Sequence, residues 1–296
     1  MTVPAPTRVS TRGATISLAP FVRKVKILIS CLYLPLFRLS TATKRRIGAL
    51  QSESLVILFY HGVSRSQRPK FARQMDFLKR HTCIVPADWA GGTMEGRACA
   101  ITFDDGFVST LANALPELQE RQIPCTLFVP AGVMGRAPDW EMEASVVRDE
   151  IVADGHTISK LASPLVTVGS HSMSHRRLSQ ITVDLARSEI EHSRSVLSDL
   201  LGREVRLISF PYGDYDRSVV DLCVQAGYEI MYSIEPVAVD PRGATRVRGR
   251  VEVTPDDSLL EIYLKSTGGY GWMPVASAIK RWVMRVRPKV EIRRAA

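Results

Sequence analysis

The first 50 residues of this chain contain no aspartate or glutamate, although nine lysines and arginines lie among them. Residues 280–296 add seven basic residues against the single acid Glu291, so the centre is mildly acidic despite a formal net charge of +9. Basic ends fit an anionic membrane surface, with two solvated tails as the alternative. No nucleic-acid partner is expected, because the centre is acidic and no regularly spaced aromatics interleave with the basic ends.

Cysteines at metal-binding or redox spacing are also lacking. The five cysteines are an odd number and include no C-x-x-C pair, so neither a disulfide framework nor a zinc knuckle is expected. Cys99 and Cys125 lie in apolar runs, which is typical of small core residues.

A long hydrophobic run is missing as well. The apolar stretch 27–37 lies between Lys26 and Arg38 and is shorter than the ~20 residues of a transmembrane helix. No clear A-x-A cleavage site accompanies it, which argues against a signal peptide. The flanking cations indicate an interfacial anchor, while an acid-free, arginine-rich start is also typical of an organelle transit peptide. We expect a cytoplasmic location or one peripheral to the membrane, with an exported location left open.

From about residue 54, short apolar runs alternate with segments of helical periodicity. The alternation predicts an α/β fold with a parallel sheet, and the number of runs in roughly 200 residues favours an incomplete (β/α) barrel over an open sheet. Pro116 implies a kink or a late start in its helix, and the insert 132–163 is expected at the rim of a cleft. The predicted strands cover residues 55–60, 99–103, 125–129, 165–168, 207–210, 229–234 and 247–253.

Two adjacent carboxylates and a glycine, Asp104-Asp105-Gly106, end the second predicted strand. Burying an unpaired carboxylate costs several kcal/mol, and two side by side push their pKa values apart. One acid can then hold a cation while the other takes a proton. In the structural alternative, both acids merely cap the following helix and Gly106 permits the turn.

Other polar residues follow predicted strands too. His61 follows the first, His171 the fourth, and the tight bend at Tyr212 the fifth. In α/β barrels, residues at the C-terminal ends of the strands meet in one active site. The Tyr212 backbone N–H could there face a developing oxyanion, with a plain turn as the alternative.

His171 and His175 are four residues apart, a spacing that places both imidazoles on one face of a helical turn. With Asp105 they form a two-histidine, one-carboxylate set that leaves positions open for water and substrate. Such a set suits Zn²⁺ as a catalytic ion, with Co²⁺, Ni²⁺ or Mn²⁺ as alternatives. A bound divalent ion lowers the pKa of its water towards ~7, and Asp104 would deprotonate that water as general base.

Together these residues resemble the polysaccharide deacetylase family with the NodB-homology domain, carbohydrate esterase family 4, over roughly residues 54–255. Residues 102–106 match the family's first motif in full, 171–175 its second, and 209–212 its third in part. The resemblance implies a distorted (β/α)7 barrel and metal-dependent removal of N-acetyl or O-acetyl groups from a sugar polymer. The resemblance implies that Asp104 is the base and that Asp105, His171 and His175 are the metal ligands. It also implies that Tyr212 is the oxyanion donor.

Two departures from the family pattern matter. The third motif of the family begins with an arginine that orients the basic aspartate, and Ser209 stands there in this chain. We expect Arg248 or Arg250 to reach the same carboxylate from another strand. The family's late histidine, its general acid, is also missing, because no histidine follows His192. We predict that His61 protonates the leaving amine instead, with a core or turn histidine as the alternative.

The sequence therefore predicts a barrel domain at 54–268 between a basic extension at 1–53 and a basic amphipathic tail at 269–296 that includes Trp282. Trp140 is a candidate to stack on a sugar ring, with a core position as the alternative. The expected substrate is an acetylated cell-envelope glycan. The alternatives are a deformylase or other amide hydrolase acting on a lipid-linked sugar, and a carbohydrate-binding relative with impaired turnover.

Overall fold

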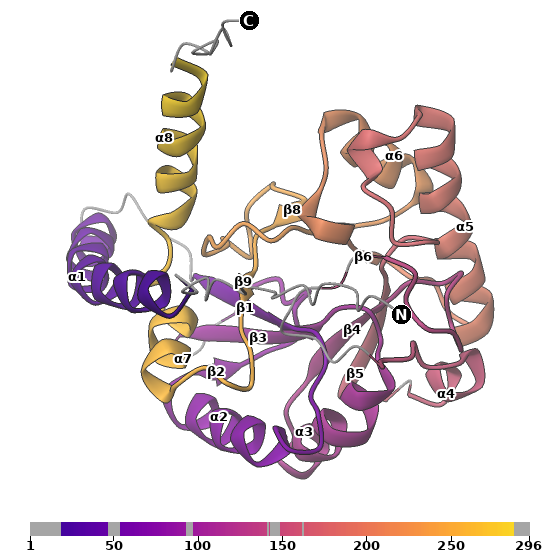
Figure 1. Ribbon diagram of the computed structural model, residues 1–296, viewed down its shortest axis with the longest axis horizontal. Helices are drawn as coiled ribbons and strands as arrows, with labels where there is room; N and C mark the ends of the chain where they lie inside the picture. Colours follow the sequence, from indigo (N-terminus) through magenta and orange to yellow (C-terminus); the bar gives the residue numbers. More distant parts are fainter. Residues whose placement is uncertain are drawn as a thin grey trace, which may run out of the picture.

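A curled parallel sheet forms the centre of the computed structural model, which describes residues 19–46, 54–92, 97–140, 142, 149–161 and 163–286 (Figure 1). The strand order is β8-β7-β6-β5-β4-β3-β1-β9, and β2 pairs with β3. The strands are β1 (Leu55–Tyr60), β2 (Cys83–Ile84), β3 (Ala98–Phe103), β4 (Cys125–Val129), β5 (Val166–Ser170), β6 (Leu207–Ser209), β7 (Ile230–Tyr232), β8 (Val247–Arg248) and β9 (Val251–Glu252).

The two ends of this strand order are joined by the chain itself. β8 and β9 lie at opposite edges of the sheet, yet only Gly249 and Arg250 separate them in sequence. Three Cα–Cα steps span at most about 11 Å, so the sheet must curl until its edges nearly meet. A Cβ at Gly249 would lie 2.3 Å from the Glu235 carbonyl oxygen, which is why only glycine fits this crossing. The predicted α/β barrel is confirmed, and the predicted strand at 247–253 is two strands divided by the crossing.

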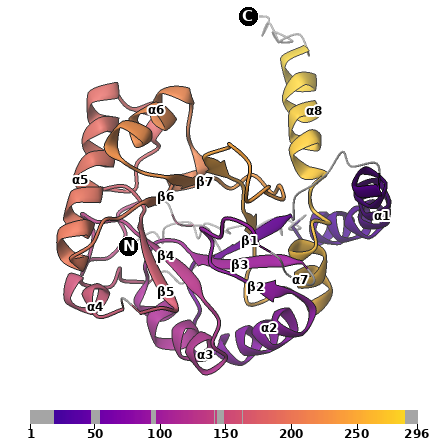
Figure 2. The same cartoon turned by 180° about the vertical axis from the view of Figure 1, so that it is seen from behind.

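Helices cover the outside of the curled sheet (Figures 1 and 2). Their ends follow local signals: Thr182, Asp216 and Ser258 accept backbone N–H bonds at N-termini, and Gly202 and Gly227 end helices in the left-handed conformation. The helices are α1 (Ala19–Arg46), α2 (Arg68–His81), α3 (Leu115–Glu120), α4 (Gly155–Ser159), α5 (Val183–Leu201), α6 (Arg217–Ala226), α7 (Leu259–Ser266) and α8 (Met273–Val286).

Pro116 marks a late helix start, because α3 begins at Leu115 after a π-helical turn, Thr110–Ala114. Proline is tolerated in the first turn, where its missing N–H leaves no helical bond unmade.

The basic extension at the N-terminus contributes α1, which packs on α7 beside the barrel. The stretch 27–37 is part of this single helix. Among the described residues, no helix is both long and apolar enough to cross a membrane. The tail contributes α8, whose ribbon projects away from the barrel (Figure 1), while the side chains around Trp282 lie outside the described residues.

Candidate active site

The paired acids lie where β3 ends, and both are buried. The strand hydrogen bonding continues through Asp104, whose N–H donates to the Tyr60 carbonyl at 2.9 Å. Asp105 and Gly106 then both adopt positive φ angles, 67° and 62°. A left-handed aspartate is uncommon and marks a backbone held by its surroundings, as is frequent at functional sites. This reversal separates the two neighbouring carboxylates, so that each meets a different set of partners.

Asp104 is bound by Arg250, the residue at the β8–β9 crossing. Arg250 Nη1 donates to Asp104 Oδ1 at 2.7 Å, and Nη2 donates to Oδ2 at 2.8 Å. The arginine side chain has no exposed surface. Its guanidinium also lies over the ring of Phe59, at 4.6 Å from the centroid. Such a bidentate pair fixes the orientation of the carboxylate as well as its charge.

Ser209 completes this arrangement. Its hydroxyl accepts from Arg250 Nη2 at 2.7 Å, and its carbonyl oxygen lies 2.8 Å from His171 Nδ1. The serine therefore contacts both the arginine that holds Asp104 and the first of the two histidines. Its short side chain leaves room for a guanidinium that arrives from the other side of the barrel.

Arg248, the second arginine expected near Asp104, points elsewhere. It donates to the carbonyl oxygens of Ala87, Trp89 and Pro241, on the side where a loop follows β2. In a regular strand, residues 248 and 250 would point to the same face. Here Gly249 lies at the crossing between two short strands, so the two arginines diverge and only Arg250 enters the barrel. Of the two candidates, Arg250 alone contacts the carboxylate.

The pKa of Asp104 reflects both its burial and its partner. Burial favours the neutral acid, but the charge of Arg250 outweighs it and lowers the pKa to about 2. Asp104 is therefore an ionised carboxylate across the physiological pH range. The pKa of Asp105 is lowered as well: burial again opposes ionisation, and His175 favours it.

Asp105 faces the two histidines. Its Oδ1 lies 3.3 Å from His175 Nε2 and 3.6 Å from His171 Nε2. One ligand atom from each of the three buried residues lies within 4.8 Å of the others. Burial lowers the pKa of His171 to about 4, which keeps its imidazole neutral at pH 7.

The two histidines reach Asp105 from a turn, and the expectation of a helical face is wrong. Ser172 and His175 both have positive φ, 62° and 57°, which no α-helix contains. Glu189, on the buried face of α5, holds the turn by accepting the N–H groups of Met173 and Ser174 at 3.0 and 2.7 Å. The spacing of four residues brings the imidazoles together through this turn instead.

Glu189 was not among the predicted site residues. The available signal was an acid on the buried helix stripe with Ala186, Ile190 and Leu197, where Glu189 is the one charged residue. A charged residue in such a position must meet a partner, and here the partners are backbone N–H groups of the histidine turn.

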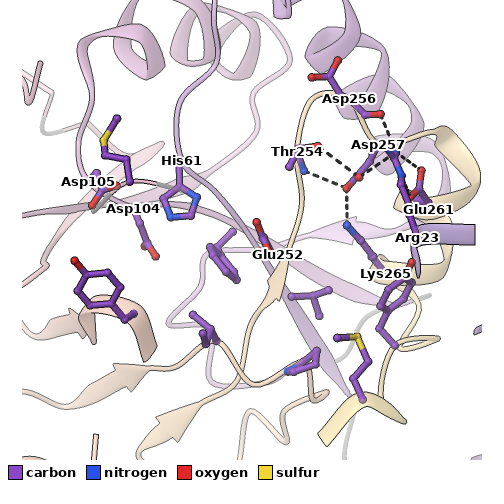
Figure 3. Close-up of a pocket in the computed structure, with 18 of the residues that line it drawn as sticks. Arg23, His61, Asp104, Asp105, Glu252, Thr254, Asp256, Asp257, Glu261 and Lys265 are labelled. Atoms are coloured by element: carbon purple, nitrogen blue, oxygen red, sulfur yellow. Dashed lines mark hydrogen bonds and ion pairs between the residues drawn. The ribbon is translucent and has the colours of Figure 1, made fainter. Parts of the chain in front are cut away.

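His61 lies on the same side of the cleft as the two acids (Figure 3). Its carbonyl oxygen accepts from Thr110 Oγ1 at 2.8 Å, and the next part of its loop is held by Asn113 Nδ2, which donates to the Val63 carbonyl oxygen at 2.8 Å. Thr110 and Asn113 both belong to the π-helical turn, a feature often found next to functional sites. The segment that sequence reasoning treated as a kink thus positions the His61 loop.

Aromatic residues surround the histidines at the mouth of the cleft. The Trp140 ring stacks on His175 at 4.3 Å between centroids, and Tyr212 meets the same imidazole edge-on at 4.7 Å. Arg177 lies over the Tyr212 ring at 3.9 Å. Trp140 therefore lies at the cleft, next to one of the histidines, and does not occupy a remote core position.

A cleft of about 1010 Å³ connects these groups to the far side of the barrel. Figure 3 shows Asp104, Asp105 and His61 at one end and an ion-pair cluster with Arg23, Asp257 and Lys265 at the other. Asp104 and Asp105 occupy only one end of this cleft, so the rest of it can hold an extended ligand.

The residues present fit a divalent ion. Asp105 Oδ1 and His175 Nδ1 are buried polar atoms without a hydrogen-bond partner, and such atoms call for an explanation. An ion held by Asp105, His171 and His175 would satisfy the carboxylate oxygen. The contact of His171 Nδ1 with the Ser209 carbonyl fixes the proton on Nδ1 and leaves Nε2 as a metal ligand. Two histidines and one carboxylate are a common catalytic zinc set.

Comparison with known proteins agrees with this geometry. Residues 91–231 match the family model described as polysaccharide deacetylase. The fold is similar to that of IcaB from Ammonifex degensii, with a TM-score of 0.61, 28% identity, and coverage of 73% of this chain and 98% of that one. Over residues 91–231 the chain belongs to the polysaccharide deacetylase family. It is an enzyme of the hydrolase class.

Two relatives of known sequence support the family assignment. YxkH of Bacillus subtilis (strain 168), a protein assigned to the polysaccharide deacetylases, is 22% identical over 213 residues, covering 68% of this chain and 72% of its own. The chitooligosaccharide deacetylase of Sinorhizobium fredii is 27% identical over 176 residues, covering 59% of this chain and 68% of its own.

This chain departs from the pattern of its family at the positions that the sequence indicated. Arg250 occupies the place beside the first acid that an arginine at position 209 would otherwise take. Tyr212 lies on the bend Pro211–Gly213 at the cleft, with φ 58°. The role of its N–H as an oxyanion donor stays a prediction.

Proposed function

We propose that this protein is a metal-dependent deacetylase that hydrolyses N-acetyl or O-acetyl groups on an amino-sugar glycan. One observation carries the proposal: two adjacent buried acids have separate partners, with Asp104 bound by Arg250 and Asp105 facing His171 and His175. Family membership gives the class of reaction, and this division of partners assigns the steps to residues.

His171, His175 and Asp105 would hold the ion, most favourably Zn²⁺, with Co²⁺, Ni²⁺ and Mn²⁺ as alternatives. When bound, such an ion supplies a Lewis acid that polarises the acetyl carbonyl and acidifies an attacking water. The protein buries all three side chains of this donor set and anchors the histidine turn to Glu189, which holds the donor set in place.

Asp104 would accept the proton of the attacking water. Its low pKa keeps it ionised, and Arg250 prevents rotation of the carboxylate away from the cleft. In the second half of the reaction the C–N bond breaks, and the leaving amine takes a proton. His61 is the proposed donor, because its ring lies beside the acids at the same end of the cleft.

The substrate class follows from the cleft and from the relatives. A cleft of about 1010 Å³ is large for a single sugar, and Trp140 offers a flat aromatic surface next to His175. The curated relatives are named for polysaccharide and chitooligosaccharide deacetylation. We therefore favour an oligomeric N-acetylated glycan over a formylated lipid-linked sugar. Four polar groups buried together argue against a binding protein without turnover, which has no need of them.

The direct test is acetate release from chitooligosaccharides and peptidoglycan fragments by the full chain, with and without EDTA. We expect release that stops with EDTA, returns with added Zn²⁺ and falls by about 10³-fold or more in Asp104→Asn. Arg248→Met is the matched control, because Arg248 is buried at the same crossing without touching Asp104. Acetate release that survives both EDTA and Asp104→Asn would exclude the proposed chemistry, and release of formate alone would favour a deformylase.

A further inference from the structure

An unpartnered apolar stripe runs along the outer face of α1. Among the described residues, nineteen large apolar side chains are exposed to solvent, and eight of these lie on α1. Six of the eight recur at helical spacing on one face, with exposed fractions between 37% and 68%: Phe21, Val25, Leu28, Leu32, Leu36 and Leu39. We call these six residues the outer stripe. Patches of this kind mark interaction sites, whereas single exposed apolar residues need no explanation.

The opposite face of the same helix is already used. Ser30 and Leu34 are buried, and Trp272 Nε1 donates to the Ser30 hydroxyl at 3.0 Å. Arg23 binds both oxygens of Glu261 on α7 at 2.6 Å. α1 is therefore anchored to the barrel by one face, and the outer stripe does not arise from a helix that has come loose.

The charge around the stripe identifies its partner. α1 contains no acid, and six of its seven basic residues lie near its two ends, Arg23, Lys24 and Lys26 in the first turns and Lys44-Arg45-Arg46 in the last. The seventh, Arg38, donates to the Tyr263 hydroxyl at 2.6 Å, and Arg23 is paired with Glu261. The preceding residues carry two more arginines and no acid. An apolar face with cations at both ends of its helix suits the boundary between acyl chains and anionic headgroups.

The apolar surface also extends from α1 onto α7. A groove of about 540 Å³ separates the two helices, and Leu260 on its rim is 51% exposed. Its other apolar lining residues are Cys31, Leu34, Pro35, Leu39 and Leu264. Leu39 belongs to both the groove and the outer stripe, so the two form one continuous apolar surface.

We propose that the outer stripe of α1 docks on the surface of an anionic lipid bilayer, with α1 lying in the plane of the headgroups. α1 does not cross the bilayer in this arrangement. The barrel is held against the membrane through the α1–α7 contact.

The experiment is co-sedimentation of the full chain with vesicles, once with phosphatidylcholine alone and once with about a third of the lipid as phosphatidylglycerol. We expect binding to the anionic vesicles that weakens between about 0.1 M and 1 M salt, since the Debye length falls from about 10 to 3 Å. Leu28→Asp/Leu32→Asp should lower the partition coefficient at least tenfold, because it places two carboxylates in the apolar face.

The matched control is Val183→Asp/Leu185→Asp on α5, which replaces two side chains that are 55% and 37% exposed. It adds the same charge at a helix start, where acids are tolerated, and should bind vesicles like the wild type. Circular dichroism and thermal unfolding check that both variants are folded.

Three results would overturn the proposal. The first is wild-type protein that stays in the supernatant with anionic vesicles at low salt. The second is equal binding by the wild type and Leu28→Asp/Leu32→Asp. The third is a wild-type dimer in the absence of lipid, measured by light scattering, that becomes monomeric in Leu28→Asp/Leu32→Asp, together with no vesicle binding. That result would make the stripe a contact between two copies of the chain. None of these measurements needs catalysis, so they stand apart from the proposed deacetylation.

A consequence for the substrate rests on the proposed function. Val22, Arg23 and Lys26 of α1 line the cleft, and Figure 3 shows Arg23 at the end away from Asp104 and Asp105. A docked α1 therefore places that end next to the bilayer. A short acetylated oligosaccharide displayed on a lipid should then be deacetylated faster in anionic vesicles than in detergent solution. Leu28→Asp/Leu32→Asp should abolish this difference and retain the rate in detergent. Equal rates of the wild type in both media would contradict this consequence alone.

Discussion

Two arginine–carboxylate pairs in this protein are both bidentate but lie in very different surroundings. Arg250 and Asp104 pair inside the barrel, where the arginine is fully buried. Arg23 and Glu261 pair between α1 and α7, where the arginine is 46% exposed. Both carboxylates are opposed by burial and favoured by their arginine, which brings each pKa to about 2.

The comparison shows that geometry alone does not reveal what a pair is for. A surface pair contributes about 1 kcal/mol or less, whereas removal of one partner from a buried pair leaves an uncompensated charge. The inner pair is thus costly, and well-packed apolar residues would stabilise the barrel at least as well. Its presence at the cleft indicates a chemical role, while the outer pair positions a helix.

The largest expected effect comes from breaking the inner pair. Arg250→Met leaves Asp104 as a buried, unpaired carboxylate, which should cost about 3–5 kcal/mol in the free energy of unfolding and raise the pKa of Asp104. Acetate release should fall by about 10²-fold or more, because the base loses its orientation. Urea denaturation and initial rates measure the two effects.

The double variant Asp104→Asn/Arg250→Met is the control for that cost. It removes the unpaired charge, so it should be more stable than Arg250→Met alone. Equal destabilisation of the single and double variants would mean that the two residues are not coupled.

Arg248→Met sharpens the comparison within the barrel. Arg248 is also buried, but it bonds only to carbonyl oxygens. Its loss should cost about 1.5–3 kcal/mol, since hydrogen bonds from a charged donor are removed, while kcat keeps its wild-type pH dependence. A shift of the acid limb of the pH–rate profile in this variant would show that Arg248 acts on Asp104 after all.

Breaking the outer pair should have a smaller effect. Arg23→Ala is expected to lower the free energy of unfolding by about 1 kcal/mol, because Arg23 is 46% exposed and the buried Glu261 carboxylate keeps two hydrogen bonds from Ser258. The difference from the wild type should shrink as salt is raised. Thermal unfolding at low and high salt provides the measurement. If Arg23→Ala lowered the free energy of unfolding as much as Arg250→Met, the outer pair would be as important for stability as the inner pair.

The stability that the outer pair contributes should also depend on pH. The pKa of Glu261 falls from 4.5 to about 2 in the folded protein, because Arg23 outweighs the effect of burial. Its stabilisation is therefore fully present above pH 4.5 and is lost as the pH falls towards 2. The stability difference between wild type and Glu261→Gln should disappear over this window. A difference that grows with falling pH would have the wrong sign.

Strands with strong local signals could be predicted from the sequence. The apolar runs at β1, β3 and β4 are covered on both faces and give an unmistakable pattern, and the residues that follow them meet as barrel geometry requires. The crossing at Gly249-Arg250 could not be predicted, because strands of two residues carry no periodicity. The identity of the arginine at Asp104 depends on that crossing.

The histidine turn and the outer stripe show two other limits. A spacing of four residues fits a helix and a turn equally, and the outcome depends on Glu189, which is distant in sequence. The apolar stretch at 27–37 was evident, but α1 is apolar on two opposite faces. Which face packs on α7 is decided by tertiary contacts such as Arg23–Glu261 and Trp272–Ser30.

The division of work between the neighbouring acids is tested most directly by measuring bound metal and acetate release together in Asp104→Asn and Asp105→Asn. We predict that Asp104→Asn retains one divalent ion per chain and loses acetate release, whereas Asp105→Asn loses both. Acetate release by Asp104→Asn at the wild-type rate, or loss of the ion from both variants alike, would contradict the account.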